Sequence, residues 1–255
     1  MPIFGKVNLK VLLMVISHKK KFVMYLPWKT ASQTIELRLR AFNESPYDLF
    51  FYFNPFLNRV VHQHITCCEF MNFPESKLNY FSASFVRNPY DRVYSGFRQL
   101  QKDIQYQPLG SYPAPWIKNH VMKQLTENFA QLCLSQFNFD NWLEQIGEEQ
   151  IFEIGRNTNF PLHPSYYWTH IDGKQVVDWI GHVENFETDF QEFTLRVNLG
   201  EVPKLNTNII ELKDGAPYNP YGYRYVDRMS KQSIDKINNL FEKDFSLFDY
   251  IKLQV

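Results

Sequence analysis

The sequence has few cysteines, and their placement limits what they can do. It contains three in 255 residues, two of which, Cys67 and Cys68, are adjacent. Neighbouring cysteines rarely pair with each other, and three cannot make the even-numbered framework of a small secreted protein. We therefore expect a reducing compartment and a cytoplasmic protein.

Excess charge of one sign is also missing. The 27 basic and 27 acidic residues give a formal net charge of zero. Proteins that coat nucleic acids need surplus cations to displace counterions, so no nucleic-acid partner is expected. Residues 1–40 are locally basic, with eight lysines and arginines against Glu36. This end attracts a phosphate-rich ligand or is simply a solvated basic surface.

No long apolar run and no repeat interrupts the chain. The apolar run near the start, residues 11–16, is far shorter than the roughly 20 residues of a membrane span, so no stable membrane insertion is expected. No period of roughly 20 to 50 residues recurs, which argues against solenoids and propellers. At 255 residues and 44% hydrophobic, the chain can bury a core. We predict a single domain over residues 1–255.

Two segments read as strand, tight loop and helix. A β-branched and aromatic run at 21–26 is stopped by Pro27 and followed by a helical pattern at 32–42. A second run at 81–86 breaks before a helix whose apolar residues are spaced by three and four. Further helices are predicted at 122–134, 139–146, 184–197 and 230–241, a further strand at 176–180, strand and loop at 50–70, and a polar loop at 155–169. This alternation predicts an α/β fold with a central, mostly parallel sheet flanked by helices, whose ligands lie at the carboxyl ends of the strands.

The first strand-to-helix loop carries anion-binding groups. Its sequence from Pro27 to Thr34 is PWKTASQT, in which Lys29 supplies a cation and the helix start supplies backbone amides. An ATP or GTP loop needs Gly-x-x-x-x-Gly-Lys, whereas this loop has no glycine. A single 5′-phosphosulfate therefore suits it better than a magnesium-bound triphosphate. The alternative is that the Ser and Thr are ordinary helix caps.

The second loop offers another cation. Arg87 ends its strand with a planar guanidinium suited to phosphate oxygens, Pro89 sets the helix start, and Ser95 lies in the helix that follows. Arg92 points elsewhere, with Asp91 or Glu69 as the expected partner.

The pairing of Lys-Thr-x-Ser-x-Thr with a downstream Arg-x-Pro-x-x-Arg-x-x-Ser resembles the sulfotransferases that use 3′-phosphoadenosine 5′-phosphosulfate (PAPS), in particular the carbohydrate branch with the heparan sulfate 2-O type and its bacterial relatives. Trp28 departs from the proline that the family usually has before the lysine. The resemblance implies a P-loop-like three-layer sandwich, with Arg87 and Ser95 binding the 3′-phosphate. It implies that the 5′-phosphosulfate is bound by Lys29, Thr30, Ala31, Ser32, Gln33 and Thr34.

Sulfuryl transfer calls for a base on the acceptor side and a cation near the bridging oxygen. The resemblance gives the second role to Lys29. His62-Gln63-His64 is similar to the His-x-His of the 2-O branch, which makes His64 the base. A strand would place His62 and His64 on the same face, where one orients the other; the alternative is that both are polar residues of a strand or loop. His163 is the second candidate base or an acceptor contact, with Arg156 nearby for an anionic acceptor, and the alternative is that both lie on a loop surface.

Other residues give less specific signals. No Cys or His spacing fits zinc and no carboxylate pair suits magnesium, so no metal is expected. The tyrosine-rich stretch 218–225, with Arg224, either closes over adenine or the 3′-phosphate or is a turn packed by its own rings.

The sequence thus predicts a PAPS-dependent sulfotransferase that acts on a hydroxyl of a carbohydrate or similar small acceptor. The alternatives are a P-loop-type small-molecule kinase and a non-catalytic nucleotide- or glycan-binding protein on the same scaffold. The identity of the acceptor and the oligomeric state are not predicted.

Overall fold

The computed structural model describes residues 14–47, 51–61, 64–106, 114–155, 160–200, 202 and 222–254, with the side chains of 104–106 left aside. A central sheet has the strand order β1-β2-β5-β8. Strand β1 runs antiparallel to β2, whereas β2, β5 and β8 are parallel to one another. The mixed α/β class and the mostly parallel sheet predicted above are confirmed. The strands are β1 (Val15–Ser17), β2 (Phe22–Tyr25), β5 (Phe81–Val86) and β8 (Trp179–His182).

The register of the parallel strands brings three loops to one edge of the sheet. Tyr25, the last residue of β2, pairs with Ser84 in β5. Val86, the last residue of β5, pairs with His182 at the end of β8. Because all three strands end at this carboxyl edge, the residues that follow them face a common region, as expected for ligand sites of parallel sheets.

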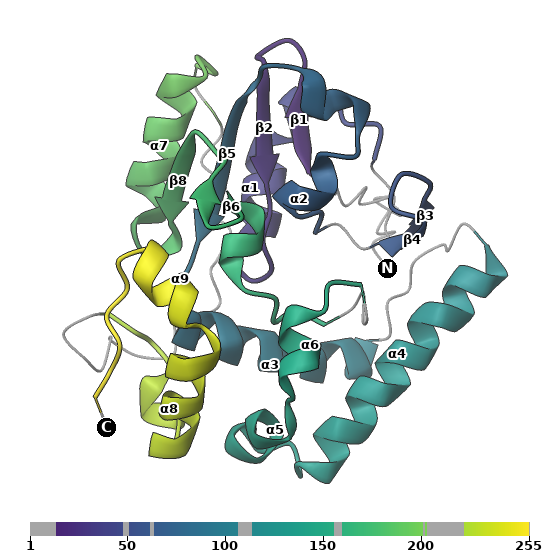
Figure 1. Cartoon of the computed structure of the whole chain (residues 1–255), viewed down its shortest axis with the longest axis vertical. Coiled ribbons are helices and arrows are strands. Elements are labelled where there is room, and N and C mark those ends of the chain that lie inside the picture. The colour runs from purple at the N-terminus through teal and green to yellow at the C-terminus, as the bar shows by residue number, and fades with distance from the viewer. Residues whose placement is uncertain are drawn as a thin grey trace, which may run out of the picture.

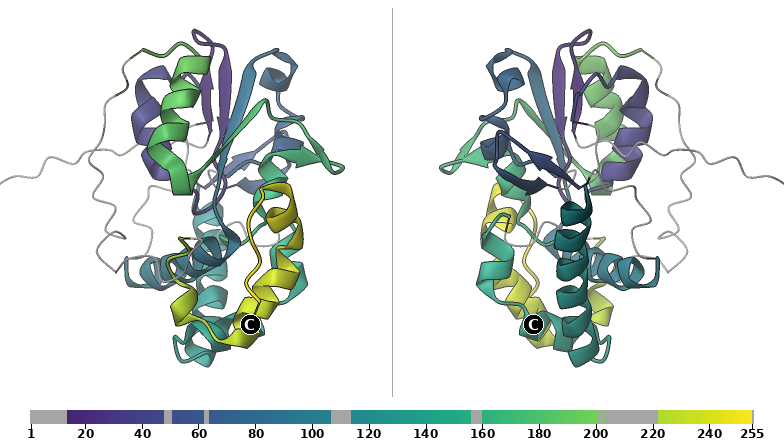
Figure 2. Two further views of the ribbon diagram at one scale, coloured as in Figure 1. Left: turned by 90° about the vertical axis from the view of Figure 1, so that its left-hand side faces the viewer. Right: turned by 90° about the vertical axis from the view of Figure 1, so that its right-hand side faces the viewer.

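Helices cover both faces of the sheet (Figure 2). Side chains alternate along a strand, so Phe22 and Met24 pack toward α1 (Ser32–Leu39) and α7 (Phe186–Arg196). On the other face, the neighbouring side chains Val23 and Tyr25 pack against Phe70 and Trp168. These two come from α2 (Cys67–Phe70) and the 3-10 turn η3 (Ser165–Trp168).

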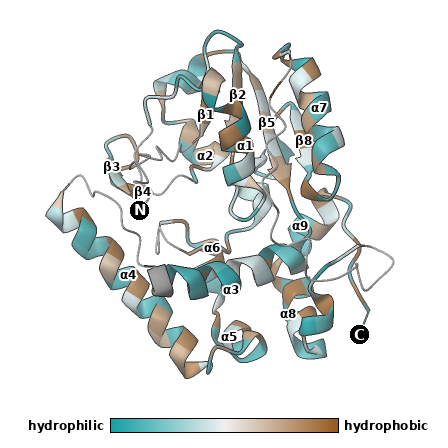
Figure 3. Cartoon of the chain, turned by 180° about the vertical axis from the view of Figure 1, so that it is seen from behind, coloured by the Kyte–Doolittle hydropathy of each residue, from teal (hydrophilic) through white to brown (hydrophobic). Residues whose placement is uncertain are grey.

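A second group of helices lies beyond the carboxyl edge, with α3 crossing below the sheet (Figure 1). Its core is aromatic and includes Tyr90, Phe97, Trp142 and Phe241. Helix α4 of this group carries both hydrophobic and hydrophilic residues along its length, as does α7, which packs on the sheet (Figure 3). The helices of this group are α3 (Pro89–Tyr106), α4 (Pro115–Leu134), α5 (Phe139–Gln145), α6 (Glu148–Phe152), α8 (Lys231–Leu240) and α9 (Glu242–Leu247).

Small elements complete the described chain. Two antiparallel hairpins lie outside the central sheet, and short 3-10 turns join the larger elements. The hairpins are β3 (Tyr52–Asn54) with β4 (Arg59–Val61) and β6 (His170–Ile171) with β7 (Lys174–Gln175); the turns are η1 (Arg40–Phe42), η2 (Pro74–Lys77), η4 (Val183–Asn185) and η6 (Val226–Arg228).

Arg38 ties α1 to α7. Its guanidinium donates to both carboxylate oxygens of Glu187, at 3.0 and 2.5 Å. The same group lies 5.0 Å from the ring centres of Phe186 and Phe190. Bidentate pairing and ring contact together fix the orientation of a guanidinium. This link holds the helix whose first turn begins at the Lys29 loop.

Arg92 has a different partner from either of the two predicted. It pairs with Asp244 of α9 at 3.3 Å, and both side chains are 0% exposed. Its Nη1 also donates to the carbonyl of His163 at 2.8 Å. Glu69 instead pairs with Arg59. The prediction was wrong because it considered only Asp91, which precedes Arg92 directly, and Glu69 in the same part of the sequence. Asp244 is far from Arg92 in the sequence, and the fold of the last helices brings the two together.

Removing one partner of this buried pair should be costly. Asp244→Ala leaves the Arg92 charge buried without its counterion, which typically lowers the free energy of unfolding by about 3–5 kcal/mol. Urea unfolding followed by circular dichroism measures the change. The matched control is Glu127→Ala, which breaks a surface pair with Lys123 in which the side chains are 60% and 79% exposed; such pairs contribute little. Equal midpoints for the two variants would contradict the assigned role.

Two further observations concern the described part of the chain. None of its helices is both long and apolar enough to cross a membrane. Cys67, Cys68 and Cys133 are free thiols, in agreement with the expectation that the adjacent pair does not form a disulfide.

Candidate functional site

The loop between β2 and α1 has an unusual backbone. Lys29 and Ala31 both take positive φ values, 61° and 59°, a region that non-glycine residues seldom enter and that often marks functional loops. The Thr30 hydroxyl is buried and donates to the carbonyl of Pro27 at 2.9 Å, closing the loop on itself. The N-cap residue of α1 is Ala31, whose side chain has no polar atom with which to cap the helix. The first-turn amides of α1 therefore remain oriented for an anion.

Lys29 reaches from this loop to α3. Its ammonium donates to Gln99 Oε1 at 3.1 Å, and Gln99 Nε2 donates to Asp103 Oδ1 at 2.7 Å. Burial raises the pKa of Asp103, while its hydrogen bond with Gln99 and the charge of Lys29 act in the opposite direction. The cation is thus held over one face of α3.

Arg87 stands at the carboxyl end of β5, where it is only 6% exposed. Its Nη2 lies 4.0 Å from Asp91 Oδ2 in the first turn of α3. Asn88 caps this helix by accepting the amide of Asp91 at 2.9 Å, and Pro89 presets the helical backbone angle. Ser95, 5% exposed, lies one turn after Asp91.

The two strand ends meet on one face of α3. Asp91, Ser95 and Gln99 are spaced by four residues and so form a stripe along the helix. Arg87 contacts the first and Lys29 contacts the last. Eight residues of α-helix span roughly 12 Å. A guanidinium and an ammonium therefore flank a buried serine hydroxyl along this stripe.

His64 packs directly on the Lys29 loop. Its Nδ1 lies 2.5 Å from the carbonyl of Leu26. A carbonyl only accepts, so Nδ1 carries the hydrogen and Nε2 carries the lone pair. The ring lies 3.9 Å from that of Trp28, tilted by 33°. Burial lowers the pKa of His64 to about 3; the hydrogen bond to Leu26 raises it and the charge of Lys29 lowers it further. The imidazole is neutral near pH 7.

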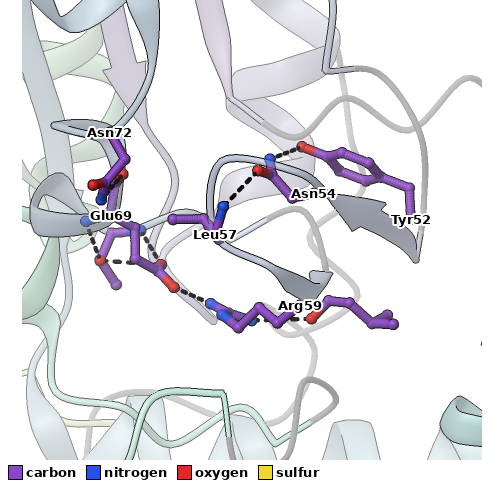
Figure 4. Close-up of polar contacts among 8 residues, drawn as sticks. Tyr52, Asn54, Leu57, Arg59, Glu69 and Asn72 are labelled. Atoms are coloured by element: carbon purple, nitrogen blue, oxygen red, sulfur yellow. Dashed lines mark hydrogen bonds and ion pairs between the residues drawn. The ribbon is translucent and has the colours of Figure 1, made fainter.

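An ion pair between Arg59 and Glu69 supports the start of α2, the helix that follows His64 in the chain (Figure 4). Glu69 accepts the amide and hydroxyl of Thr66 at 3.0 and 3.1 Å, and Thr66 accepts the amide of Glu69 at 3.2 Å. This reciprocal arrangement is a capping box at the start of α2. Arg59 of β4 pairs with the same carboxylate. The backbone two residues after His64 is thereby fixed.

His163, the second candidate base, lies close to the same region. Its Nδ1 donates to the carbonyl of Ile151 at 2.8 Å. Burial lowers its pKa, and its charge in turn lowers the pKa of His64. Gly96 allows the loop before His163 to pack on α3, because a Cβ there would lie 2.9 Å from Leu162.

The structure thus brings together Lys29, Arg87, Ser95 and His64 on and around the stripe of α3. Sequence reasoning missed Gln99, which holds Lys29, and Trp28, which packs on His64. The spacing of Asp91, Ser95 and Gln99 by four was a usable signal for a shared helix face. His62, Arg156 and residues 218–221 lie outside the described residues.

Within the described ranges, no group of three or more histidine, cysteine, aspartate or glutamate side chains is arranged to hold a metal ion.

Comparison with known proteins gives one match. A family model described as Sulfotransferase family matches residues 7–251. No curated protein sequence matches the chain, and no solved structure does either.

Proposed function

Because the chain belongs to the sulfotransferase family, we propose that it transfers the sulfuryl group of PAPS to a hydroxyl of a carbohydrate or similar small acceptor. One observation carries the proposal: Lys29 and Arg87 lie along the same face of α3, with His64 beside the Lys29 loop. The two cations suit the two charged ends of one nucleotide. We further propose a single domain over 1–255 with the P-loop-like three-layer arrangement and a place in the carbohydrate branch.

The residues after β2 fit the 5′-phosphosulfate. The uncapped first turn of α1 offers amides of Ser32, Gln33 and Thr34, and such helix starts favour anions. Lys29 adds a cation. The Thr30 hydroxyl already donates to the carbonyl of Pro27. In this arrangement Thr30 therefore stabilises the shape of the loop instead of bonding directly to the phosphosulfate. Ala31 supports the same shape through its left-handed backbone.

The residues after β5 fit the 3′-phosphate. Arg87 offers a rigid fork of donors that matches phosphate oxygens, and Ser95 lies on α3 one turn after Asp91, the residue that Arg87 contacts. In this proposal Arg87 and Ser95 distinguish PAPS from nucleotides with a 5′-phosphate alone.

The positions of Lys29 and His64 support a catalytic role for each residue. PAPS supplies the sulfuryl group, which leaves its 5′-phosphate as the acceptor hydroxyl attacks sulfur. Lys29 stabilises the negative charge that develops on the leaving phosphate. His64 accepts the hydroxyl proton at Nε2, while its Nδ1–H donates to Leu26 and fixes the ring. Bound phosphosulfate would offset the charge of Lys29 and make His64 a stronger base.

Transfer of radiolabelled sulfate from PAPS to a panel of glycans and small hydroxyl compounds tests this function. We expect label on at least one acceptor, without added metal. Magnesium-dependent ATP turnover with no sulfate transfer would instead indicate a kinase. Tight nucleotide binding without transfer to any acceptor would indicate a non-catalytic protein.

Arg87→Ala should weaken binding of 3′-phosphoadenosine 5′-phosphate (PAP). A hydrogen bond to a charged group contributes about 1.5–3 kcal/mol, so we expect the dissociation constant to rise about 10- to 100-fold. Isothermal titration calorimetry measures this. Arg196→Ala is the matched control, because Arg196 lies in the last turn of α7, where its side chain is 48% exposed. Unchanged PAP affinity in the Arg87 variant would remove Arg87 from the proposed site.

A further inference from the structure

A buried carboxylate lies beside the proposed 3′-phosphate site. Asp91 is 2% exposed, and its Oδ1 accepts the backbone amides of Arg224 and Tyr225 at 2.9 and 3.1 Å. Its Oδ2 accepts Asn88 Nδ2 at 2.9 Å and lies 4.0 Å from Arg87 Nη2. One side chain therefore joins the end of β5 to a segment more than 130 residues later in the chain.

A second carboxylate, that of Glu184, also holds this strand end. Glu184 Oε1 accepts the backbone amide and the side-chain Nδ2 of Asn88, at 2.9 and 2.8 Å. Its Oε2 accepts the hydroxyl of Tyr250 at 3.0 Å. Asn88, which directly follows Arg87, is thus bonded to both carboxylates. The backbone that presents Arg87 is held in one conformation.

The segment that Asp91 holds also packs on α3. The ring of Tyr225 stacks on that of Tyr94, with centroids 4.7 Å apart and planes at 22°. The guanidinium of Arg228 lies 5.7 Å from the centre of the Tyr225 ring. This packing places the 222–228 segment against α3 at Tyr94, three residues after Asp91.

A negative group next to an anion site works against anion binding unless it orients the groups that bind. The contacts of Asp91 are of the orienting kind, since both oxygens accept hydrogen bonds and one faces the arginine. We propose that Asp91 is a positioning residue for recognition of the nucleotide 3′-phosphate: it orients Arg87 and holds the 222–228 segment as a wall of the same site. This inference rests on the proposed function.

Asp91→Asn tests the inference, because asparagine keeps the shape but replaces one acceptor oxygen with a donor. Calorimetry gives the dissociation constants of PAP and AMP for each variant. We expect PAP affinity to fall tenfold or more and AMP affinity to change less than twofold, so that the preference for PAP declines. Asp140→Asn is the control: Asp140 also accepts a backbone amide from the last part of the chain, that of Ser230 at 2.9 Å, but it lies in α5 rather than at the carboxyl edge of the sheet. Its preference should equal that of the wild type.

A merely structural role predicts a lower melting temperature with an unchanged ratio of PAP to AMP affinity, and that result would overturn the inference. Equal losses for both nucleotides would overturn it too. If Asp91→Asn does not fold, Tyr225→Leu decides, since it keeps the Asp91 bonds to the backbone and removes the ring contacts with Tyr94 and Arg228 that pack the 222–228 segment; its preference should also fall. A wild-type protein without any preference for PAP would refute the donor assignment itself, which is a distinguishable failure.

Discussion

Lys29→Ala is expected to lower kcat about 100- to 1,000-fold, the loss typical when one donor to a developing anion is removed. The ammonium lies at the carboxyl end of β2, held at 3.1 Å from Gln99, on the side of α3 assigned to the phosphosulfate. Its charge acts on the leaving phosphate, where negative charge grows during transfer. Single-turnover transfer from labelled PAPS measures the effect on the chemical step alone.

The matched control is Lys174→Ala, since Lys174 lies in the exposed hairpin strand β7. This variant should have the wild-type rate. If Lys29→Ala kept more than a tenth of the wild-type single-turnover rate at saturating PAPS, leaving-group stabilisation would have to come from another group.

His64→Asn should lower the transfer rate about 100- to 10,000-fold, the usual contribution of general base catalysis, while PAP affinity changes little. Asparagine retains a polar group near Leu26 but has no basic nitrogen. His120→Asn is the control, because His120 is exposed on α4. A His64 variant with the full wild-type rate would transfer the role of base to another group, with His163 the first to test.

The pH dependence of the His64 ring gives an independent check. Burial lowers its pKa to about 3, so the ring binds a proton only well below its ordinary value near 6.5. In the free protein the base form should therefore persist from pH 8 down to pH 5. Nitrogen NMR of the imidazole, assigned by its loss in the Asn variant, should show a neutral ring protonated at Nδ1. Titration near pH 6.5 would contradict the buried environment.

The local part of the site was predictable from the sequence because each strand-to-helix switch is encoded by neighbouring residues. The apolar run at 81–86 matches β5, and the helix predicted from residue 32 begins at Ser32. Proline and lysine at one switch and arginine and proline at the other marked the loops. Their convergence followed from parallel pairing, since Tyr25 and Ser84 are paired.

Features that depend on distant contacts were not predictable. Strand β8 begins at Trp179 rather than at 176, because Val176 donates to Thr169 and Asp178 bonds to Ser82 ahead of the strand.

Two helices were missed although their signals are local. Helix α4 begins at Pro115, well before the predicted residue 122, and proline suits a first helical turn. The 50–70 region also contains a short helix, α2, stabilised by a capping box between Thr66 and Glu69.

In the site, too, the local sequence marks some features, whereas others depend on contacts between distant parts of the chain. Lys29, Arg87, Ser95 and His64 were singled out from motifs. The partners that orient them, such as Gln99 for Lys29, lie on other elements and have no local signature. The packing of Trp28 on His64 gives a physical reason for the residue at which the loop departs from the usual family pattern.

The most direct test of the central claim is a calorimetric titration of the wild-type protein with PAP and with AMP. If Lys29 and Arg87 bind opposite ends of one nucleotide, PAP should bind at least tenfold more tightly than AMP, because only PAP contacts Arg87 and Ser95. Equal affinities would show that the end of β5 does not bind a 3′-phosphate and would contradict the proposed donor.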